Sequence, residues 1–573
     1  MKLRTVWVSA ALLFLLALPA RVPAQGAGDY LKVVPEDAVG FAVIRQIGAA
    51  SDKVQKLAKL VDSPLPGEPL MIVKQTLGVD KGLDEKGNIV AVFLGGSGAP
   101  QAVVLVPVTD YKTFVAPLKP AKDDGSVTEV ETAKEKLLVA KKGAFAAFTQ
   151  PTDRAALEKV LTATKDVTAN VTPLRSWLDS QDAAAVLTTP GVKLVAGLAQ
   201  GGLKEAKQNL AGLPPELQGF GAMVEGLESL VKQLESGVTH AAVGVQVDAS
   251  LNVNVTFRSV FASGSELAKS AGKVAPLTGG PLAGLPAGPF VVAGGGVYPE
   301  EALKALSGFG FQMFKQLAKD LPAEKLKKLE EAYANMYKGV RGMTMSWGLG
   351  KEGDPLFSGI AGLMQVDDAA AYLAGYEKAI AAMNELLKDA KIPLGTIYEV
   401  KKVQVGGVQA LELATDFSKV NGANDPAQKQ VFEKMFGDSG KMTISMVAAD
   451  PKTVLMRYSS AAALKADLQT FKDRKGGLAT DADVAKATAQ LPKDAQWAMY
   501  ISPHGGLQFV NRMMTLMGAP AQQKLPPFPV TPPVAFGVKL SSGGLESQLV
   551  VPVGVLQGIG TFSRVMKAGP GVQ

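Results

Sequence analysis

Cysteine and histidine, the side chains that most often supply nucleophiles and metal ligands, are scarce in this sequence. The chain has no cysteine and two histidines, His240 and His504. Without cysteine it can form no disulfide, use no thiol nucleophile and offer no thiolate to a metal. Zinc sites usually need three or four nitrogen or sulfur ligands. The sequence therefore argues against a histidine-based zinc site. Calcium bound by carboxylates stays an alternative, although no Asp-x-Asp-x-Asp-Gly loop is present, and we assign no metal site and no cofactor.

Two glycine-rich segments have partial likeness to catalytic or phosphate-binding motifs. His504 lies in SPHGG (502–506), and esterases with such an oxyanion loop also need a Gly-x-Ser-x-Gly nucleophile turn, which is lacking here. We therefore interpret this segment as a helix start. Residues 437–443, GDSGKMT, have the wrong spacing for a phosphate loop. The glycines 294–296, expected between a strand at 290–293 and a helix, have the wrong spacing for a dinucleotide fingerprint.

Adjacent carboxylates are the remaining candidates for acid–base chemistry. The pairs are Glu36/Asp37, Glu300/Glu301 and Asp367/Asp368. All lie at expected turns or helix starts, where an acid caps backbone N–H groups and favours the helix dipole. We interpret Asp110 and the pair Asp367/Asp368 as N-caps and predict no catalytic residue. A hydrolase that uses only carboxylates would need two of them about 5–10 Å apart across a groove.

A group of methionines near the C-terminus is the one candidate for an apolar ligand pocket. It consists of Met499, Phe509, Met513, Met514 and Met517. Methionine adapts its shape to apolar ligands, although it fills protein cores for the same reason. The proline-rich segment that follows, 525–533, is expected to run extended as a spacer.

The N-terminus has the three parts of a secretory signal peptide. Lys2 and Arg4 precede an apolar stretch at 6–18, and small residues precede the bond between Ala24 and Gln25. The apolar stretch is shorter than the roughly 20 residues of a membrane span. We therefore expect cleavage after Ala24, a mature chain with no transmembrane span, and export to the periplasm or the extracellular space.

The charge of the chain does not indicate a nucleic-acid partner. Removal of the three basic residues of the signal peptide lowers the formal charge from +7 to +4. Lysine and glutamate are also interleaved, as in EKLKKLEE (324–331), whereas nucleic-acid-binding proteins concentrate positive charge on one face. An envelope polymer, a lipid or a protein is the kind of partner that we expect.

A degenerate unit of strand, one or two helices, two strands and a helix recurs along the chain. Its copies span about 31–120, 178–273, 285–386 and 491–567, and each begins with a turn into an apolar strand, as in VVPEDAVGFAVI (33–44). In residues 251–258, LNVNVTFR, strict alternation predicts one buried apolar face and one wet polar face. The pattern predicts an α+β fold of largely antiparallel sheets with helices packed on one face.

These four units divide the mature chain into two lobes that we interpret as homologous. The N-terminal lobe is 25–273 with a hairpin insert at about 127–165, and the C-terminal lobe is 290–573 with an insert at about 397–470. The inserts contain turn signals such as Gly406-Gly407 and Asp450-Pro451. The uncharged Pro/Gly-rich segment 274–289 is the expected linker.

Four phrases resemble a known group of sequences. They are YLKVVPEDAVGFAVI (30–44), GLDEKGN (82–88), VPVTDYKTF (106–114) and QPTDRAALEKVL (150–161). They are similar to uncharacterised signal-bearing exported proteins of planctomycete-type bacteria. The resemblance implies export and a repeated α+β architecture, and it carries no catalytic residue.

Together these features favour a non-enzymatic exported protein of the periplasm or cell envelope, with a binding or structural role. Strong scaffold repeats and few chemical motifs support this expectation. A carboxylate-only hydrolase of envelope polymers and a carrier of apolar ligands or lipids are the alternatives.

Overall fold

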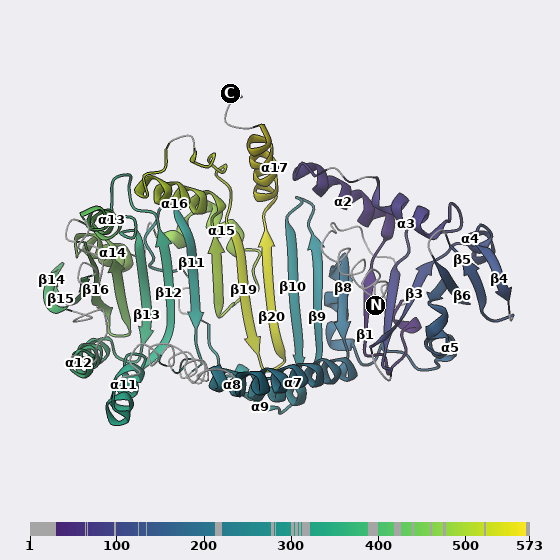
Figure 1. Cartoon of the computed structure of the whole chain (residues 1–573), viewed down its shortest axis with the longest axis horizontal. Helices are drawn as coiled ribbons and strands as arrows, with labels where there is room; N and C mark the ends of the chain where they lie inside the picture. The colour runs from purple at the N-terminus through teal and green to yellow at the C-terminus, as the bar shows by residue number, and fades with distance from the viewer. Residues whose placement is uncertain are drawn as a thin grey trace. The chain divides into compact units, whose positions relative to one another are not determined.

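The chain forms two compact units in the computed structural model (Figure 1). Unit 1 comprises residues 1–209, 224–272 and 540–564, and unit 2 comprises residues 210–223, 273–539 and 565–573. The structure describes residues 30–63, 65, 67–96, 99–123, 125–132, 135–211, 220–276, 280, 282–299, 303, 308, 311, 321–387, 399–416, 426–437, 440–458, 461–473, 477–520 and 523–568. The predicted signal peptide, with its expected cleavage site between Ala24 and Gln25, and the pair Glu300/Glu301 lie outside these residues.

Unit 1 begins with the predicted order of elements. These are β1 (Gly40–Ile44), α2 (Ile47–Leu60), α3 (Pro69–Leu77), β2 (Ile89–Leu94), β3 (Gln101–Pro107) and α4 (Tyr111–Val115). An insert follows, with β4 (Lys119–Asp123), β5 (Thr128–Glu131), β6 (Lys136–Lys142), β7 (Phe145–Thr149), α5 (Arg154–Thr162) and α6 (Arg175–Ser180). The order then recurs in β8 (Ala183–Leu187), α7 (Thr189–Ala211), α8 (Phe220–Gly237), β9 (Val238–Val247), β10 (Val253–Phe261) and α9 (Glu266–Ala271).

Unit 2 has a similar order. Its first part contains β11 (Phe290–Val297), α11 (Ala323–Asn335), β12 (Val340–Gly348), β13 (Ile360–Val366) and α12 (Ala369–Leu387). The insert contains β14 (Glu399–Val405), β15 (Val408–Asp416), α13 (Pro426–Phe436), β16 (Lys441–Asp450), β17 (Thr453–Tyr458), α14 (Ala461–Asp473) and α15 (Ala482–Thr488). The chain continues through β18 (Trp497–Ile501), α16 (Pro503–Leu516) and β19 (Val534–Ser541). It then returns to unit 1 with β20 (Gly544–Val551) and most of α17 (Val553–Ala568).

Every strand pair of the described chain that has a recorded register is antiparallel, which confirms the predicted α+β class. In unit 1 the strand order is β4-β5-β6-β7-β3-β2-β1-β8-β9-β10-β20. In unit 2 it is β14-β15-β16-β17-β13-β12-β11-β18-β19. The two orders correspond strand by strand up to β9 and β19. Homology of the lobes stays a prediction.

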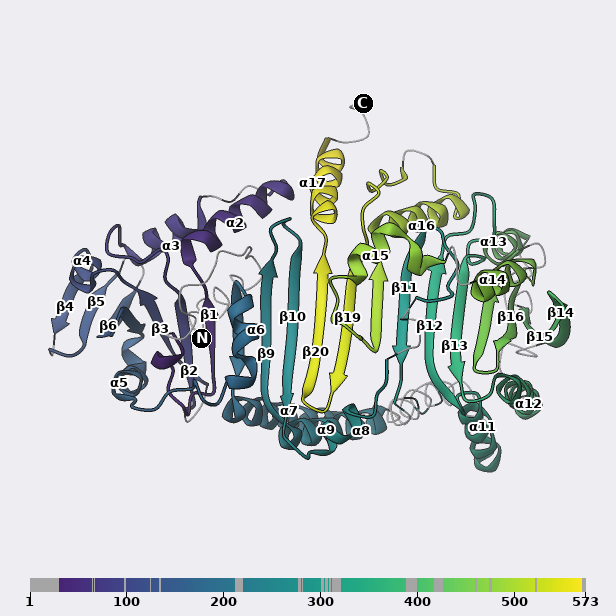
Figure 2. The same cartoon turned by 180° about the vertical axis from the view of Figure 1, so that it is seen from behind.

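The hydrophobic cores lie between the sheets and the helices of each unit. In unit 1 one core joins Phe41, Val92 and Leu105 of the sheet to Leu157 of α5 and Leu178 of α6. Helices α2 and α7 lie at opposite ends of the strands of this unit, as Figures 1 and 2 both show. In unit 2 a core joins Leu329 of α11 and Ile380 of α12 to strand residues such as Met446.

The glycines 294–296 lie within a strand, so the sequence-based placement in a loop was wrong. Strand β11 continues to Val297 between β12 and β18. A Cβ atom on Gly294 would lie 2.2 Å from the carbonyl oxygen of Ala498, and one on Gly295 would lie 2.0 Å from that of Met343. Positive φ angles of 152° and 146° further favour glycine at these two positions. The three glycines therefore allow the neighbouring strands β12 and β18 to approach β11 closely.

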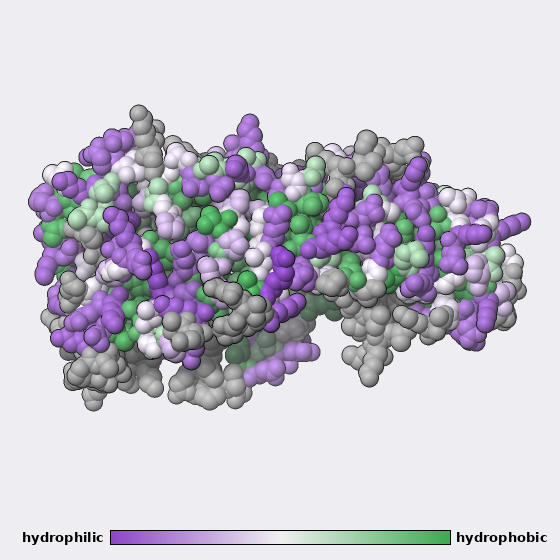
Figure 3. All heavy atoms as spheres, turned by 90° about the horizontal axis from the view of Figure 1, so that it is seen from above, coloured by the Kyte–Doolittle hydropathy of each residue, from purple (hydrophilic) through white to green (hydrophobic). Residues whose placement is uncertain are grey.

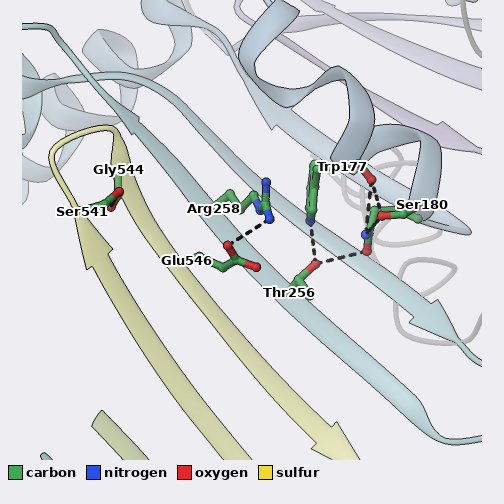
Figure 4. Close-up of polar contacts among 8 residues, drawn as sticks. Trp177, Ser180, Thr256, Arg258, Ser541, Gly544 and Glu546 are labelled. Carbon is green, nitrogen blue, oxygen red and sulfur yellow. Dashed lines mark hydrogen bonds and ion pairs between the residues drawn. The ribbon is translucent and has the colours of Figure 1, made fainter. Parts of the chain in front are cut away.

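The alternating strand β10 is buried on its polar face, contrary to the prediction. Asn254 and Thr256 are 5% and 8% exposed, whereas Phe257 is 41% exposed. Figure 4 shows the reason, because the Trp177 indole of α6 covers this face and its Nε1 donates a hydrogen bond to Thr256 Oγ1 at 3.0 Å. The Thr256 hydroxyl in turn donates to Gln181 Oε1 at 3.1 Å. Hydrogen-bonded partners thus stabilise a polar face that the pattern alone assigns to solvent.

Candidate functional site

Three of the four described carboxylates of the predicted pairs, all but Glu36, are held by capping or ion-pair partners. Asp110 and Asp368 accept hydrogen bonds from the backbone N–H groups of Thr113 (2.7 Å) and Ala371 (2.8 Å), which confirms them as N-caps. Hydrogen bonds from Thr113 lower the pKa of Asp110. Asp367 instead receives two hydrogen bonds from the Arg341 guanidinium, at 2.7 and 2.9 Å, so its interpretation as an N-cap was wrong; these bonds lower its pKa. Asp37 pairs with Lys159 at 2.5 Å.

The two histidines occupy different environments. His504 lies in the first turn of α16, where Ser502 Oγ accepts the Gly505 N–H at 3.1 Å, so the interpretation as a helix start is confirmed. Its Nδ1 is 2.6 Å from the carbonyl oxygen of Phe528, in the proline-rich segment. His240 is a buried residue of β9 whose Nε2 has no hydrogen-bond partner, and burial lowers its pKa.

The residues of the predicted methionine group are not among those that line the groove of unit 2 described below. Phe509 packs edge-on against Trp347, with ring centroids 5.0 Å apart. Met499 pairs with Phe536 in the sheet, and Met517 is 69% exposed at the end of α16. Met513 and Met514 are half-buried on α16. The groove of unit 2 is instead lined by a neighbouring, polar face of the same helix.

This groove has a volume of about 820 Å³ and lies among three elements of unit 2. The β12–β13 loop contributes residues 352–356, α13 contributes Gln430, Glu433 and Lys434, and α16 contributes Gln508, Asn511, Arg512, Thr515 and Leu516. Lys524 completes the lining. The volume is within the range of about 300–1,000 Å³ that small-ligand sites occupy.

An aromatic cluster holds these three elements together. Phe357, which follows the loop, stacks on Phe436 of α13 at 5.5 Å. Phe357 also contacts Phe509 of α16 at 6.3 Å, and Phe509 contacts Trp347 at the end of β12. Such aromatic pairs add about 0.5–1.5 kcal/mol each to the energy of area burial. The groove-lining residues Arg512 and Glu433 lie one helical turn from Phe509 and Phe436, so the cluster fixes where they stand.

Asn511 holds Lys524, one of the cations that line the groove, in its place. Its side-chain Nδ2 donates to the carbonyl oxygen of Leu525 at 2.8 Å, and its Oδ1 accepts the Leu525 N–H at 2.9 Å. These two bonds fasten the chain beside α16 and place Lys524 at the groove. The proline-rich segment 525–533, which was expected to run extended as a spacer, is therefore hydrogen-bonded to α16 at Leu525 and at Phe528.

The charged side chains of the groove are available for a ligand. Within the described parts of the chain, Glu352, Glu433, Lys434, Arg512 and Lys524 form no side-chain hydrogen bond or ion pair. The Nη1 atom of Arg512 is also buried without a hydrogen-bond partner. An unpaired buried donor on a charged group costs free energy that an added acceptor would recover.

A buried charged cluster in unit 1 is the second place where polar chemistry concentrates. Lys53 Nζ of α2 is 3.4 Å from Asp182 Oδ1, and these side chains are 8% and 15% exposed. Burial lowers the pKa of Lys53 and raises that of Asp182, which also accepts the Val247 N–H. Arg45 donates to the carbonyl oxygens of Asp179 and Gln181.

This cluster distinguishes unit 1 from unit 2. Arg45 N donates to Asp182 O, and at the corresponding strand end of unit 2 Val297 N donates to Gln496 O. A cation and an anion of unit 1 are thus replaced by uncharged residues. Because Lys53 and Asp182 are both buried, the pair is placed to anchor α2 on the sheet rather than to meet a ligand.

The described residues contain no group of histidine, cysteine, aspartate and glutamate side chains that could hold a metal ion. They also include no helix with the length and apolar character needed to cross a bilayer. No protein family, curated protein or solved structure matches this chain. The groove of unit 2 is therefore the best candidate for a functional site on the grounds of its own geometry.

Proposed function

We propose that this is an exported, non-enzymatic binding protein that holds its ligand in the groove of unit 2. The observation that carries the proposal is a groove of about 820 Å³ in which five of the six charged side chains, all but Asp354, are unpaired within the described structure. Export is supported by the n-region, apolar stretch and cleavage residues of the first 24 positions.

The two alternatives receive less support. Of the described acids of the predicted carboxylate pairs, Asp37, Asp367 and Asp368 have capping or ion-pair partners, and neither these nor Glu36 line the groove. An apolar carrier would need a largely apolar pocket, whereas most of the groove lining is polar or charged.

The test fills the groove with a large side chain. Thr515 lines the groove, and its Oγ1 donates to the carbonyl oxygen four residues earlier at 2.8 Å. Thr162 on α5 makes the same bond at 2.8 Å and is likewise exposed, so Thr162→Trp is a matched control. We expect a ligand panel of peptides, glycans and fatty acids to contain compounds that raise the Tm of the wild type and of Thr162→Trp but not of Thr515→Trp. Equal shifts in all three proteins would contradict the proposal.

Export is tested separately in the native host. We expect the mature protein in the periplasmic or culture fraction to begin at Gln25 by N-terminal sequencing. An uncleaved chain that begins at Met1 in the cytoplasm would exclude export.

A further inference from the structure

We infer that the groove binds a short peptide with free amino and carboxyl termini, an inference that rests on the proposed function. The groove presents three acidic and three basic side chains. A ligand that carries both charges can pair with both sets, whereas a ligand of one sign meets like charges as well as opposite ones.

The charges of the groove are segregated by structural element. The β12–β13 loop contributes two carboxylates, Glu352 and Asp354, and α16 with its following segment contributes two cations, Arg512 and Lys524. Helix α13 contributes one of each sign, Glu433 and Lys434. A dipolar ligand can therefore direct its cationic end to the loop and its anionic end to α16.

Arg512 identifies the group expected at the anionic end. Its Nη1 is buried and lacks an acceptor, and a guanidinium pairs with a planar carboxylate through two parallel hydrogen bonds. A terminal carboxylate has this geometry and reaches the groove without a bulky substituent. Nearby Asn511 is already bonded to Leu525, so it does not compete for that carboxylate.

The rest of the lining is suited to a peptide backbone. Gln430 can donate to and accept from amide groups. Gln508 and Thr515 can accept through their oxygens while they keep their bonds to His504 and to the Asn511 carbonyl, and Pro355, Leu356 and Leu516 offer small apolar contacts. Three carboxylates would repel a polyanion, and six charged residues would leave an apolar chain poorly accommodated.

The test compares tetrapeptide mixtures with free termini and the same mixtures acetylated and amidated, with native mass spectrometry and thermal shift as readouts on the mature full-length protein. We expect only the free-terminus mixture to bind. Arg512→Gln should weaken this binding at least tenfold, whereas Arg564→Gln, an exposed arginine of α17, should leave it unchanged. Glu433→Gln should weaken it as well, unlike Glu205→Gln at an exposed position of α7.

The outcomes distinguish failure of the peptide inference from failure of the proposed binding function. If a glycan or a fatty acid binds and Thr515→Trp abolishes that binding, while free peptides do not bind, the peptide inference is wrong and the binding function stands. Equal binding of free and blocked peptides, or insensitivity to Arg512→Gln, would also overturn the inference. If no compound binds in a manner sensitive to Thr515→Trp, both proposals fail.

Discussion

In β10 the polar residue Thr256 is buried, whereas its apolar neighbour Phe257 is exposed. The hydroxyl of Thr256 accepts from Trp177 and donates to Gln181, and both partners are buried. We expect Thr256→Val to lower the free energy of unfolding by about 2 kcal/mol, because the Trp177 N–H and the Gln181 oxygen lose their partner.

The comparison variant for this prediction is Phe257→Thr, which changes the exposed face of the same strand. We expect it to alter the free energy of unfolding by less than about 1 kcal/mol, since a half-exposed side chain loses little burial. Urea denaturation followed by circular dichroism measures both. A larger loss for Phe257→Thr than for Thr256→Val would contradict the burial described for β10.

His240 makes stability depend on pH. Burial lowers its pKa in the folded protein below the unfolded value of about 6.5, so the unfolded chain binds the proton more readily. The stabilising neutral state is therefore fully available above about pH 6.5, and stability falls as the pH drops toward the folded pKa. We expect a loss of up to about 1.4 kcal/mol per pH unit in this window.

Replacement of the imidazole isolates this contribution. We expect His240→Gln to have a shallower decline of unfolding free energy between pH 7 and pH 5 than the wild type, measured by urea denaturation at several pH values. His504→Gln provides the control, since His504 lies in the first turn of α16. If the unfolding free energy of His240→Gln falls with pH as steeply as that of the wild type, His240 does not cause the pH dependence.

At the scale of elements, Lys53 and Asp182 fasten α2 to the start of β8. Removal of one member of a buried ion pair leaves the other charge uncompensated. We expect Lys53→Met to lower the free energy of unfolding by about 3 kcal/mol, and Lys56→Met at an exposed position of the same helix to change it by no more than about 0.5 kcal/mol.

The double variant distinguishes a charge effect from loss of packing. Lys53→Met with Asp182→Asn removes both charges and keeps an acceptor for the Val247 N–H. We expect it to be more stable than Lys53→Met alone in thermal and urea unfolding. A double variant that is less stable than the single one would show that the charges are not coupled.

Local patterns could predict most elements but not their environment. The hairpins β6–β7, β14–β15 and β16–β17 were predicted from turn residues and alternation, because both signals act between near neighbours. The groove could not be predicted in this way. It depends on which face of α16 lies beside α13 and the β12–β13 loop, and a helical period does not specify the neighbour. A polar stripe at 508, 511, 512 and 515 was the available signal.

At the scale of the whole molecule, the C-terminal strand β20 belongs to unit 1. It pairs with β10 from Val253–Val551 to Val260–Gly544, and Arg258 forms an ion pair with Glu546 at 2.9 Å. Figure 4 shows this ion pair beside the hairpin turn at Ser541 and Gly544. The sequence suggested lobes contiguous in the chain, because repeat patterns do not contain information on pairing between strands almost 300 residues apart.

Truncation tests the contribution of β20. We expect a chain that ends at Gly543 to lose amide-exchange protection in β10, because that strand loses a hydrogen-bonded neighbour. A chain that ends at Ala568 should keep wild-type protection, since it retains β20 and α17. Hydrogen exchange with mass spectrometry measures both, and full protection of β10 in the shorter chain would contradict the prediction.

The surface of the protein is mixed in hydropathy. In the view of Figure 3, hydrophobic residues lie in small groups among hydrophilic ones. Apolar side chains that are more than one-third exposed occur on several separate elements, among them Leu198 of α7, Met517 after α16 and Val530 of the proline-rich segment. Scattered exposure of this kind is ordinary in folded proteins and does not by itself mark an interface.

The late position of β20 in the chain sets the order of events during synthesis and transport. Unit 1 contains the first strands to emerge from the ribosome, yet its sheet is complete only when residues 544–551 have emerged. Until then β10 presents an open hydrogen-bonding edge, and the unit cannot reach its final stability. For the export that we propose, this delay would be an advantage, because a unit that is still incomplete passes more easily through a narrow translocation channel.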